Sequence, residues 1–205
     1  MALEIPCDTP KIIIILSSCI LLSACSETIH WQDEALLSSG QKIIVNRTVE
    51  RIPAELGHRR ATSYDIKTKY PATGKNLIWE GDFGLGPIML DFKNNQAFVV
   101  AIPMMCDAKI KEFSIPGFPY IFMRSLDGKK WKVISPSQFP KEFKKANLIA
   151  YDEGQISKGK RQSADEISNV NKYVEGASQG HFQITIPRSP EDWNYKLDKK
   201  FNGCG

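Results

Sequence analysis

The sequence lacks the short motifs by which catalytic sites are usually recognised. It contains no G-x-S-x-G, HExxH or CxxC motif, no phosphate-binding P-loop and no GxGxxG. Its three histidines, His30, His58 and His181, are spread along the chain, and none is adjacent to another histidine or to a cysteine. We therefore expect no metal and no cofactor. A serine-histidine-aspartate triad stays open, because its members assemble in space and not in sequence.

An excess of charge of one sign is also missing. The chain has 27 Lys and Arg against 23 Asp and Glu, a formal net charge of +4. This excess is too small and too dispersed to indicate a nucleic-acid partner. Long apolar runs are absent after the first 22 residues. The apolar run Ile12–Leu22 has about 11 residues, whereas a membrane-spanning helix needs about 20.

The first 25 residues have the layout of an export signal. Lys11 precedes the apolar run Ile12–Leu22, and small residues follow it. The tetrapeptide Leu22-Ser23-Ala24-Cys25 resembles the lipobox of bacterial lipoproteins. This resemblance implies cleavage after Ala24 and attachment of a diacylglyceryl group and further palmitate-type acyl chains to Cys25. The alternative is an ordinary signal peptide in which the cysteine has no special role.

These features predict three segments and a location. Residues 1–24 are expected to be a signal peptide, 25–30 a lipidated tether, and 31–205 a single periplasmic domain. Ser26 follows the acylated cysteine, and serine at this place resembles the lipoproteins that are sorted to the outer membrane. We therefore expect a protein that is lipid-anchored in the cell envelope, on the outer membrane facing the periplasm.

Two cysteines, Cys106 and Cys204, remain once the signal peptide is removed with Cys7 and Cys19 and once Cys25 carries lipid. Because the periplasm is oxidising, a structural disulfide bond between them is the first hypothesis. The bond would close a loop of about 100 residues, which the chain-entropy treatment values at up to roughly 4.7 kcal/mol. Free thiols and a metal site are the alternatives. The metal site has the weaker support, because no histidine lies at ligand spacing from either cysteine.

Paired apolar runs around turn residues predict antiparallel hairpins. Each pair flanks a short polar segment with glycine or asparagine, which is typical of a tight turn. The three hairpins are expected at 34–37 with 42–45, at 88–92 with 98–102, and at 120–123 with 131–134. Further strands are expected at 63–70, 77–80 and 182–186. Frequent prolines between these runs disfavour long helices.

Only the C-terminal third shows helical periodicity. Ser163 and Glu166 form a capping-box pattern, followed by apolar residues at helical spacing, so a helix is expected over 163–175. A second short helix is expected near 189–192, where Pro190 suits a first helical turn. The predicted fold is mainly β, with antiparallel hairpins arranged as a sandwich or barrel and one or two short C-terminal helices.

One group of aromatic residues has two interpretations. Phe118, Tyr120 and Phe122 lie close together after Gly117, and they are candidates for contact with a partner. Packing in the core of the sheet is the simpler alternative.

Across most of the mature chain, the sequence resembles a group of short uncharacterised proteobacterial lipoproteins with no known activity. The residues that carry the resemblance are Trp31-Gln32-Asp33-Glu34, Ser39-Gly40, Val45-Asn46-Arg47, Pro119-Tyr120-Ile121, Trp131, Phe139-Pro140, Asn147-Leu148 and the cysteine near the C-terminus.

Three functions remain in view. The first is a non-catalytic, protein-binding module of the cell envelope. The second, a sharper form of the first, is an immunity lipoprotein against a secreted toxin. The third is a periplasmic hydrolase with an unrecognised site, for which His58 or His181 beside a carboxylate would be evidence.

Overall fold

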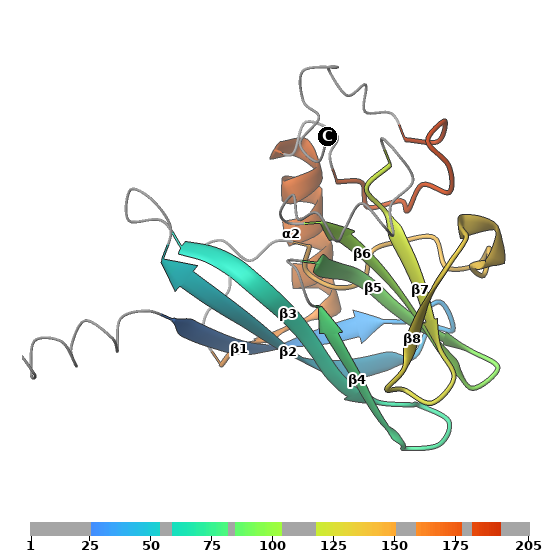
Figure 1. The fold of residues 1–205 in the computed structure, drawn as a ribbon, viewed down its shortest axis with the longest axis horizontal. Helices are drawn as coiled ribbons and strands as arrows, with labels where there is room; N and C mark the ends of the chain where they lie inside the picture. The colour runs from blue at the N-terminus through green and yellow to red at the C-terminus, as the bar shows by residue number, and fades with distance from the viewer. Residues whose placement is uncertain are drawn as a thin grey trace, which may run out of the picture.

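In a computed structural model, the described residues form a β sandwich of two sheets and one α-helix (Figure 1). The structure describes residues 26–53, 59–81, 85–103, 118–150, 159–177 and 182–193. The mainly β prediction is therefore confirmed. The sandwich form follows from the sequence, because most strands place an apolar side chain on every second residue and must cover that face.

The two sheets have different sizes and a simple order. The five-stranded sheet, in the order β4-β3-β2-β1-β9, contains β1 (Glu27–Leu36), β2 (Lys42–Pro53), β3 (Arg59–Lys69), β4 (Asn76–Gly81) and β9 (Arg161–Gln162). The four-stranded sheet, in the order β5-β6-β7-β8, contains β5 (Leu85–Lys93), β6 (Gln96–Pro103), β7 (Ile121–Ser125) and β8 (Trp131–Ile134). Neighbouring strands are antiparallel, except that β9 is parallel to β1.

All three predicted hairpins are present, as β1–β2, β5–β6 and β7–β8. Asn94 and Asn95 turn the second hairpin with φ values of 50° and 57°, which asparagine tolerates better than most residues. Gly128 turns the third with a φ of 78°. The predicted strands at 63–70 and 77–80 correspond to β3 and β4.

Strand β1 begins earlier than expected, inside the segment 25–30 that the sequence predicts to be a tether. Glu27 already pairs with Arg51 of β2, and Ile29 pairs with Val49. Ile29 is only 5% exposed, so the ladder starts where the first inward apolar residue needs cover. Only Ser26 therefore lies between the lipobox cysteine and the folded sheet.

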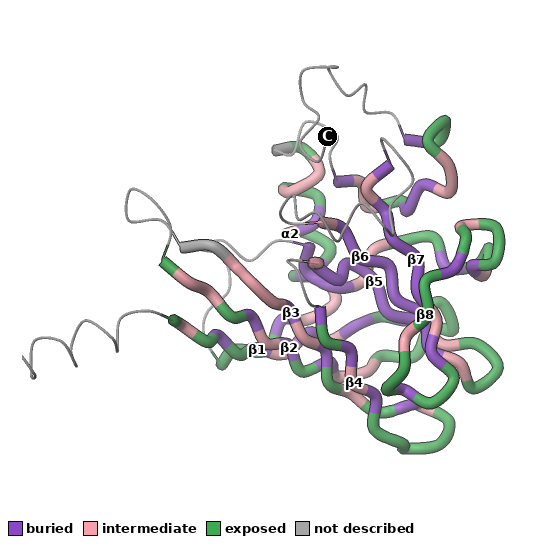
Figure 2. The backbone as a smooth tube through the Cα atoms, in the orientation of Figure 1, coloured by how far each residue is buried: buried purple, intermediate pink, exposed green. Residues whose placement is uncertain are grey.

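The first core fills the space between the sheets, and both sheets carry buried, purple positions in Figure 2. Inward positions of the five-stranded sheet alternate with exposed or half-exposed ones, as expected for a sheet with one wet face. The main contributors are Ile29, Trp31, Val45, Val49, Ile66, Leu77, Trp79, Leu90, Val99 and Ile121.

A second core lies on the other face of the four-stranded sheet. Alternate residues of β6 and β7 point away from the first core and pack against aromatic residues from later in the chain. Edge-to-face ring pairs connect Phe122 to Phe139 at 5.0 Å and Phe98 to Phe143 at 5.6 Å. The described segments 139–150 and 182–193 thus cover a sheet face that would otherwise be apolar and exposed.

Helix α2 (Ala164–Ala177) confirms the predicted C-terminal helix. The Ser163 N–H donates to Glu166 Oε2 at 2.7 Å, and the Glu166 N–H donates to Ser163 Oγ at 3.2 Å. This is the reciprocal capping box that the sequence pattern indicated. Ile167 is 2% exposed and faces the body of the protein.

Two predictions for the C-terminal region were wrong in detail. Residues 182–186 form no strand but only an isolated bridge between Thr185 and Lys145. This segment pairs with the loop at 144–146 and not with a sheet edge, and its apolar side chains enter the second core. The segment at 190–192 is a turn and not a helix. A short 3-10 helix, η4 (Pro136–Gln138), was not predicted.

Candidate functional site

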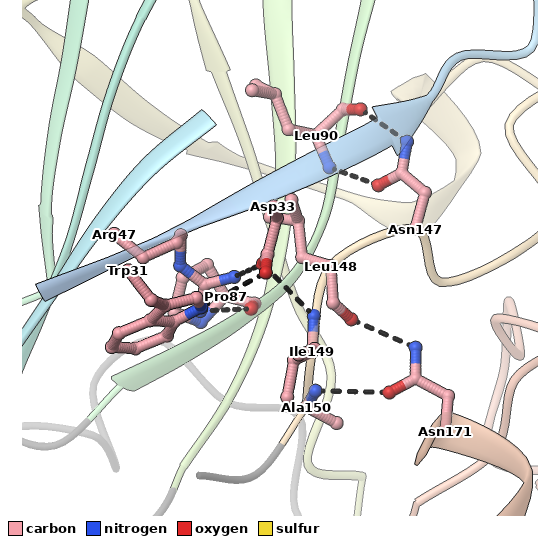
Figure 3. Close-up of polar contacts among 10 residues, drawn as sticks. All are labelled: Trp31, Asp33, Arg47, Pro87, Leu90, Asn147, Leu148, Ile149, Ala150 and Asn171. Atoms are coloured by element: carbon pink, nitrogen blue, oxygen red, sulfur yellow. Dashed lines mark hydrogen bonds and ion pairs between the residues drawn. The ribbon is translucent and has the colours of Figure 1, made fainter. Parts of the chain in front are cut away.

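A buried ion pair joins β1 and β2 inside the sandwich (Figure 3). Arg47 Nη1 donates to Asp33 Oδ2 at 2.7 Å, and the two side chains are 1% and 0% exposed. Trp31 Nε1 donates to Asp33 Oδ1 at 3.0 Å, and the guanidinium carbon lies 5.1 Å from the Trp31 ring centroid. Arg47 Nη2 also donates to the Pro87 carbonyl at 3.2 Å, so the pair connects the two sheets.

Opposing effects act on the pKa of the Asp33 carboxylate. Burial raises its pKa, while the positive charge of Arg47 lowers it. Hydrogen bonds from the Ile149 N–H, at 3.3 Å, and from Trp31 act in the same direction as Arg47. Several donors around one buried carboxylate are what is needed to retain it in an apolar core. The Asp33–Arg47 pair therefore links the two sheets to each other and to the chain near residue 149.

The segment at 147–150 is fastened on both sides (Figure 3). Asn147 Nδ2 donates to the Leu90 and Leu36 carbonyls at 2.9 and 3.1 Å, and Asn147 Oδ1 accepts the Leu90 N–H at 3.0 Å. On the helix side, Asn171 Nδ2 donates to the Leu148 carbonyl at 2.9 Å. The segment therefore covers the edge of β5 and holds helix α2 to the sheet.

The sequence holds only partial signals for these contacts. It marks four of the residues, through a family resemblance: Trp31, Asp33, Arg47 and Asn147. The structure joins the first three by hydrogen bonds and uses Asn147 to bind the backbone of β5. Asn171 was missed, although it lies at helical spacing from the buried Ile167 and is itself 0% exposed. A polar residue on the apolar face of a helix is the signal that could have found it.

The wet face of the five-stranded sheet carries a row of polar side chains. The row crosses four strands through the cross-strand pairs His30–Thr48, Thr48–Asp65 and Asp65–Glu80. His30 Nδ1 lies 3.1 Å from Thr48 Oγ1. Partial burial, and then the nearby charges of Glu80 and Glu50, raise the pKa of Asp65. The row concentrates negative charge, and within the described residues no three His, Cys, Asp or Glu side chains group as a metal site would.

A pocket lies at the end of the sandwich where three hairpin turns meet. Its volume is about 320 Å³. Its wall is formed by Leu37, Ser39, Gln41, Tyr70, Pro71, Ala72, Phe92, Lys93, Asn94 and Asn95. These residues come from the β1–β2, β3–β4 and β5–β6 turns. The sequence predicted the first and last of these turns but not their meeting.

The predicted partner-contact residues are core residues in the structure. Phe118, Tyr120 and Phe122 are 2%, 2% and 1% exposed. Phe118 and Tyr120 both pack edge-on against Trp193, and the Tyr120 hydroxyl accepts the Gln183 N–H at 2.9 Å. Core packing, the simpler interpretation of the sequence, describes their position, and they do not form a surface patch.

The remaining candidate residues lie outside the described part of the chain. They are Cys25, Cys106, Cys204, His58 and His181. The lipidation site, the disulfide bond and the hydrolase hypothesis therefore stay predictions.

Comparison with known proteins identifies no relative: no family model, no curated protein and no solved structure matches the chain. Within the described residues, no helix has the length and apolar character needed to cross a bilayer.

Proposed function

We propose that the chain is a lipoprotein of the cell envelope, anchored through lipid on Cys25, and that its sandwich binds another protein. The observation that supports this most directly is the position of β1. The strand begins at Glu27, two residues after the lipobox cysteine, and it is 10 residues long. A strand of this length spans about 33 Å.

This arrangement would place two ends of the domain in different surroundings. The start of β1 would lie close to the membrane, while the β1–β2 turn would lie about 33 Å of strand away from it. The short connection through Ser26 leaves little freedom for the domain to reverse its orientation. The turns at the far end are therefore the part of the protein that would face a partner.

Replacement of Cys25 by Ser tests the anchor. Wild-type protein should partition into the detergent phase and begin with an acylated Cys25, whereas Cys25→Ser should lose both properties. Cys19→Ser is the matched control, because Cys19 lies in the segment that would be removed. Detergent partition of Cys25→Ser with an unchanged processed N-terminus would contradict the proposal.

A second substitution tests whether the protein is sorted to the outer or the inner membrane. Ser26→Asp should move the protein from the outer to the inner membrane in a density gradient, since aspartate at this place is the inner-membrane retention signal of enteric-type sorting. Equal distribution of Ser26→Asp and wild type would remove the outer-membrane assignment and leave the lipid anchor untouched.

We also propose that Cys106 and Cys204 form a structural disulfide bond. Peptide mapping without reduction should recover the two cysteine peptides as one species. Recovery of both cysteines alkylated before reduction, in protein taken directly from cells, would refute the bond.

A further inference from the structure

The end of the sandwich at which the β1–β2, β3–β4, β5–β6 and β7–β8 turns lie is called the turn end, and it carries a pocket. Four hairpin turns gather there, at the lower right of Figure 1. Three of them form the 320 Å³ pocket. In its wall, the rings of Tyr70 and Phe92 pack edge to face at 5.3 Å. A pocket of this volume can hold one large side chain of a partner, whereas a flat partner surface could not enter it.

The fourth turn, between β7 and β8, contacts Tyr70 of the pocket wall and strand β4. Tyr70 donates its hydroxyl to the Ser125 carbonyl at 3.5 Å, and the Ile78 N–H donates to the Gly128 carbonyl at 2.7 Å. A Cβ on Gly128 would come within 2.7 Å of the Tyr70 ring. Glycine is therefore needed here both for its positive φ and for the close approach of the turn to the tyrosine.

Lysines are frequent at this end of the sandwich. The exposed lysines that flank or form the turns are Lys42, Lys69, Lys75, Lys93, Lys129 and Lys130. Lys42 pairs with Glu34 at 2.8 Å and Lys93 with Glu142 at 2.6 Å, whereas no carboxylate of a described residue pairs with the other four. The one acidic residue in these turns, Asp127, accepts the Lys129 and Lys130 backbone N–H groups at 2.9 and 2.8 Å. Four exposed lysines without a described carboxylate partner therefore lie at the same end of the sandwich as the pocket, beside the exposed carboxylate of Asp127.

Apolar side chains are exposed at the same end. Leu126, at the tip of the β7–β8 turn, is 68% exposed, and Leu36, where β1 ends, is 48% exposed. Most tight turns carry polar residues at such positions. Exposed apolar groups inside a charged rim are a common feature of protein-binding surfaces.

We propose that this turn end binds an acidic surface of another protein, with one apolar side chain of that protein seated in the Tyr70–Phe92 pocket. The inference rests on the proposed function and specifies its partner. The four lysines select for negative charge and speed the encounter, while the pocket provides the specific contact. A second membrane is the less favoured occupant, because a flat bilayer cannot enter a concave pocket.

The test uses the full lipoprotein in nonionic detergent and a defined probe. The probe is a fluorescent acidic decapeptide of glutamate and aspartate with one central benzophenone-bearing phenylalanine. It should bind with an affinity that falls as salt is added, and after illumination its adducts should map to residues 37–41, 70–75 and 93–95. A decapeptide without the aromatic residue should bind at least tenfold more weakly.

Matched charge variants distinguish binding of the peptide at the turn end from its general electrostatic attraction to the protein. The turn-end variant replaces Lys69, Lys75, Lys129 and Lys130 by Gln, and the control variant replaces Lys67, Lys144, Lys145 and Lys172 by Gln. All eight lysines are exposed, so both variants should fold, and unfolding temperatures verify this. We expect at least a tenfold loss of affinity in the turn-end variant and less than a twofold change in the control.

Three results would overturn the proposal. They are equal losses in the two variants, adducts that map outside the turns, and no binding at millimolar peptide. A further arm reconstitutes the protein in neutral vesicles and adds a second population rich in phosphatidylglycerol. Bridging of the two populations would assign the surface to a membrane and not to a protein. Because the peptide assay does not depend on lipid at Cys25, its failure would leave the anchoring proposal standing.

Discussion

The two sheets share one core, but only the five-stranded sheet leaves its other face to water. Along β1, buried and accessible residues alternate almost without a break. Along β6, six consecutive residues, Ala97–Ile102, are buried. The four-stranded sheet therefore behaves like the middle layer of a three-layer structure, with the C-terminal segment as the third layer.

This difference accounts for the described segments 135–150 and 182–193, which cover the sheet with little regular structure. Their task is to cover an apolar sheet face, and irregular segments can do this when their backbone groups find partners. Arg188 provides several of these partners by donating to the carbonyls of Phe139, Pro140 and Phe143. Its guanidinium also lies 4.8 Å from the centroid of the Phe139 ring.

The largest expected effect concerns the buried Asp33–Arg47 ion pair, which connects the two sheets. Arg47→Met should lower the free energy of unfolding by about 3–5 kcal/mol, because it leaves the Asp33 carboxylate buried without its cation. The double variant Asp33→Leu with Arg47→Met should recover a large part of the loss. Urea denaturation measures both. A double variant no more stable than Arg47→Met alone would show that the pair is not energetically coupled.

The next effect compares the two faces that lie outside the shared core. Phe122→Ala, on the covered face of the four-stranded sheet, should cost at least about 3 kcal/mol because it opens a cavity in the second core. Ile44→Ala, on the wet face of the five-stranded sheet, should cost less than about 1 kcal/mol. Similar losses in denaturant titrations would show that the C-terminal cover is not tightly packed.

A smaller effect tests how much helix α2 contributes to the stability of the C-terminal segments that cover the four-stranded sheet. Ser163→Ala should cost about 1 kcal/mol, because it removes the hydroxyl that accepts the Glu166 N–H. Ser163→Asp, which retains an acceptor, should stay near the wild-type stability. If Ser163→Ala unfolds like wild type, the helix contributes little to the cooperative unit.

The smallest effect concerns charge on the wet face and depends on pH. The pKa of Asp65 is raised above its ordinary value by partial burial and by Glu80 and Glu50, so the folded state holds this proton more tightly than the unfolded state. The stability linked to this carboxyl is present at low pH and is lost as the pH rises through the folded-state pKa.

Asp65→Asn should therefore stabilise the protein at pH 7 by about 0.5 kcal/mol, a value reduced by solvent screening. The gain should shrink towards pH 3.5, where the wild-type carboxyl is protonated. Thermal unfolding across this range measures it, with Lys67→Gln as a control that should act in the opposite direction. A gain that grows on acidification would contradict the assigned cause.

Local patterns predicted the hairpins because each signal lies within a few residues. The glycine and asparagine turns at Gly40, Asn94 and Gly128 all have positive φ, and their flanking runs pair as expected. The candidate surface could not be predicted in the same way. Its pocket is formed by three turns up to 58 positions apart, from Leu37 to Asn95, and no local pattern states which turns meet.

The sequence by itself determined strands β1 to β8 in outline, three hairpin pairings and the capped helix, because periodicity, turn chemistry and capping act between near neighbours in the chain. It also determined the export and lipobox pattern on which the proposed anchor rests. Tertiary structure decided the rest. It turned the aromatic group at 118–122 inward and made 182–186 a cover and not a strand. It also joined Asp33 to Arg47, and Asn147 to the backbone of β5. These outcomes depend on which apolar face needs cover and on which buried polar groups need partners, and both are properties of the assembled molecule.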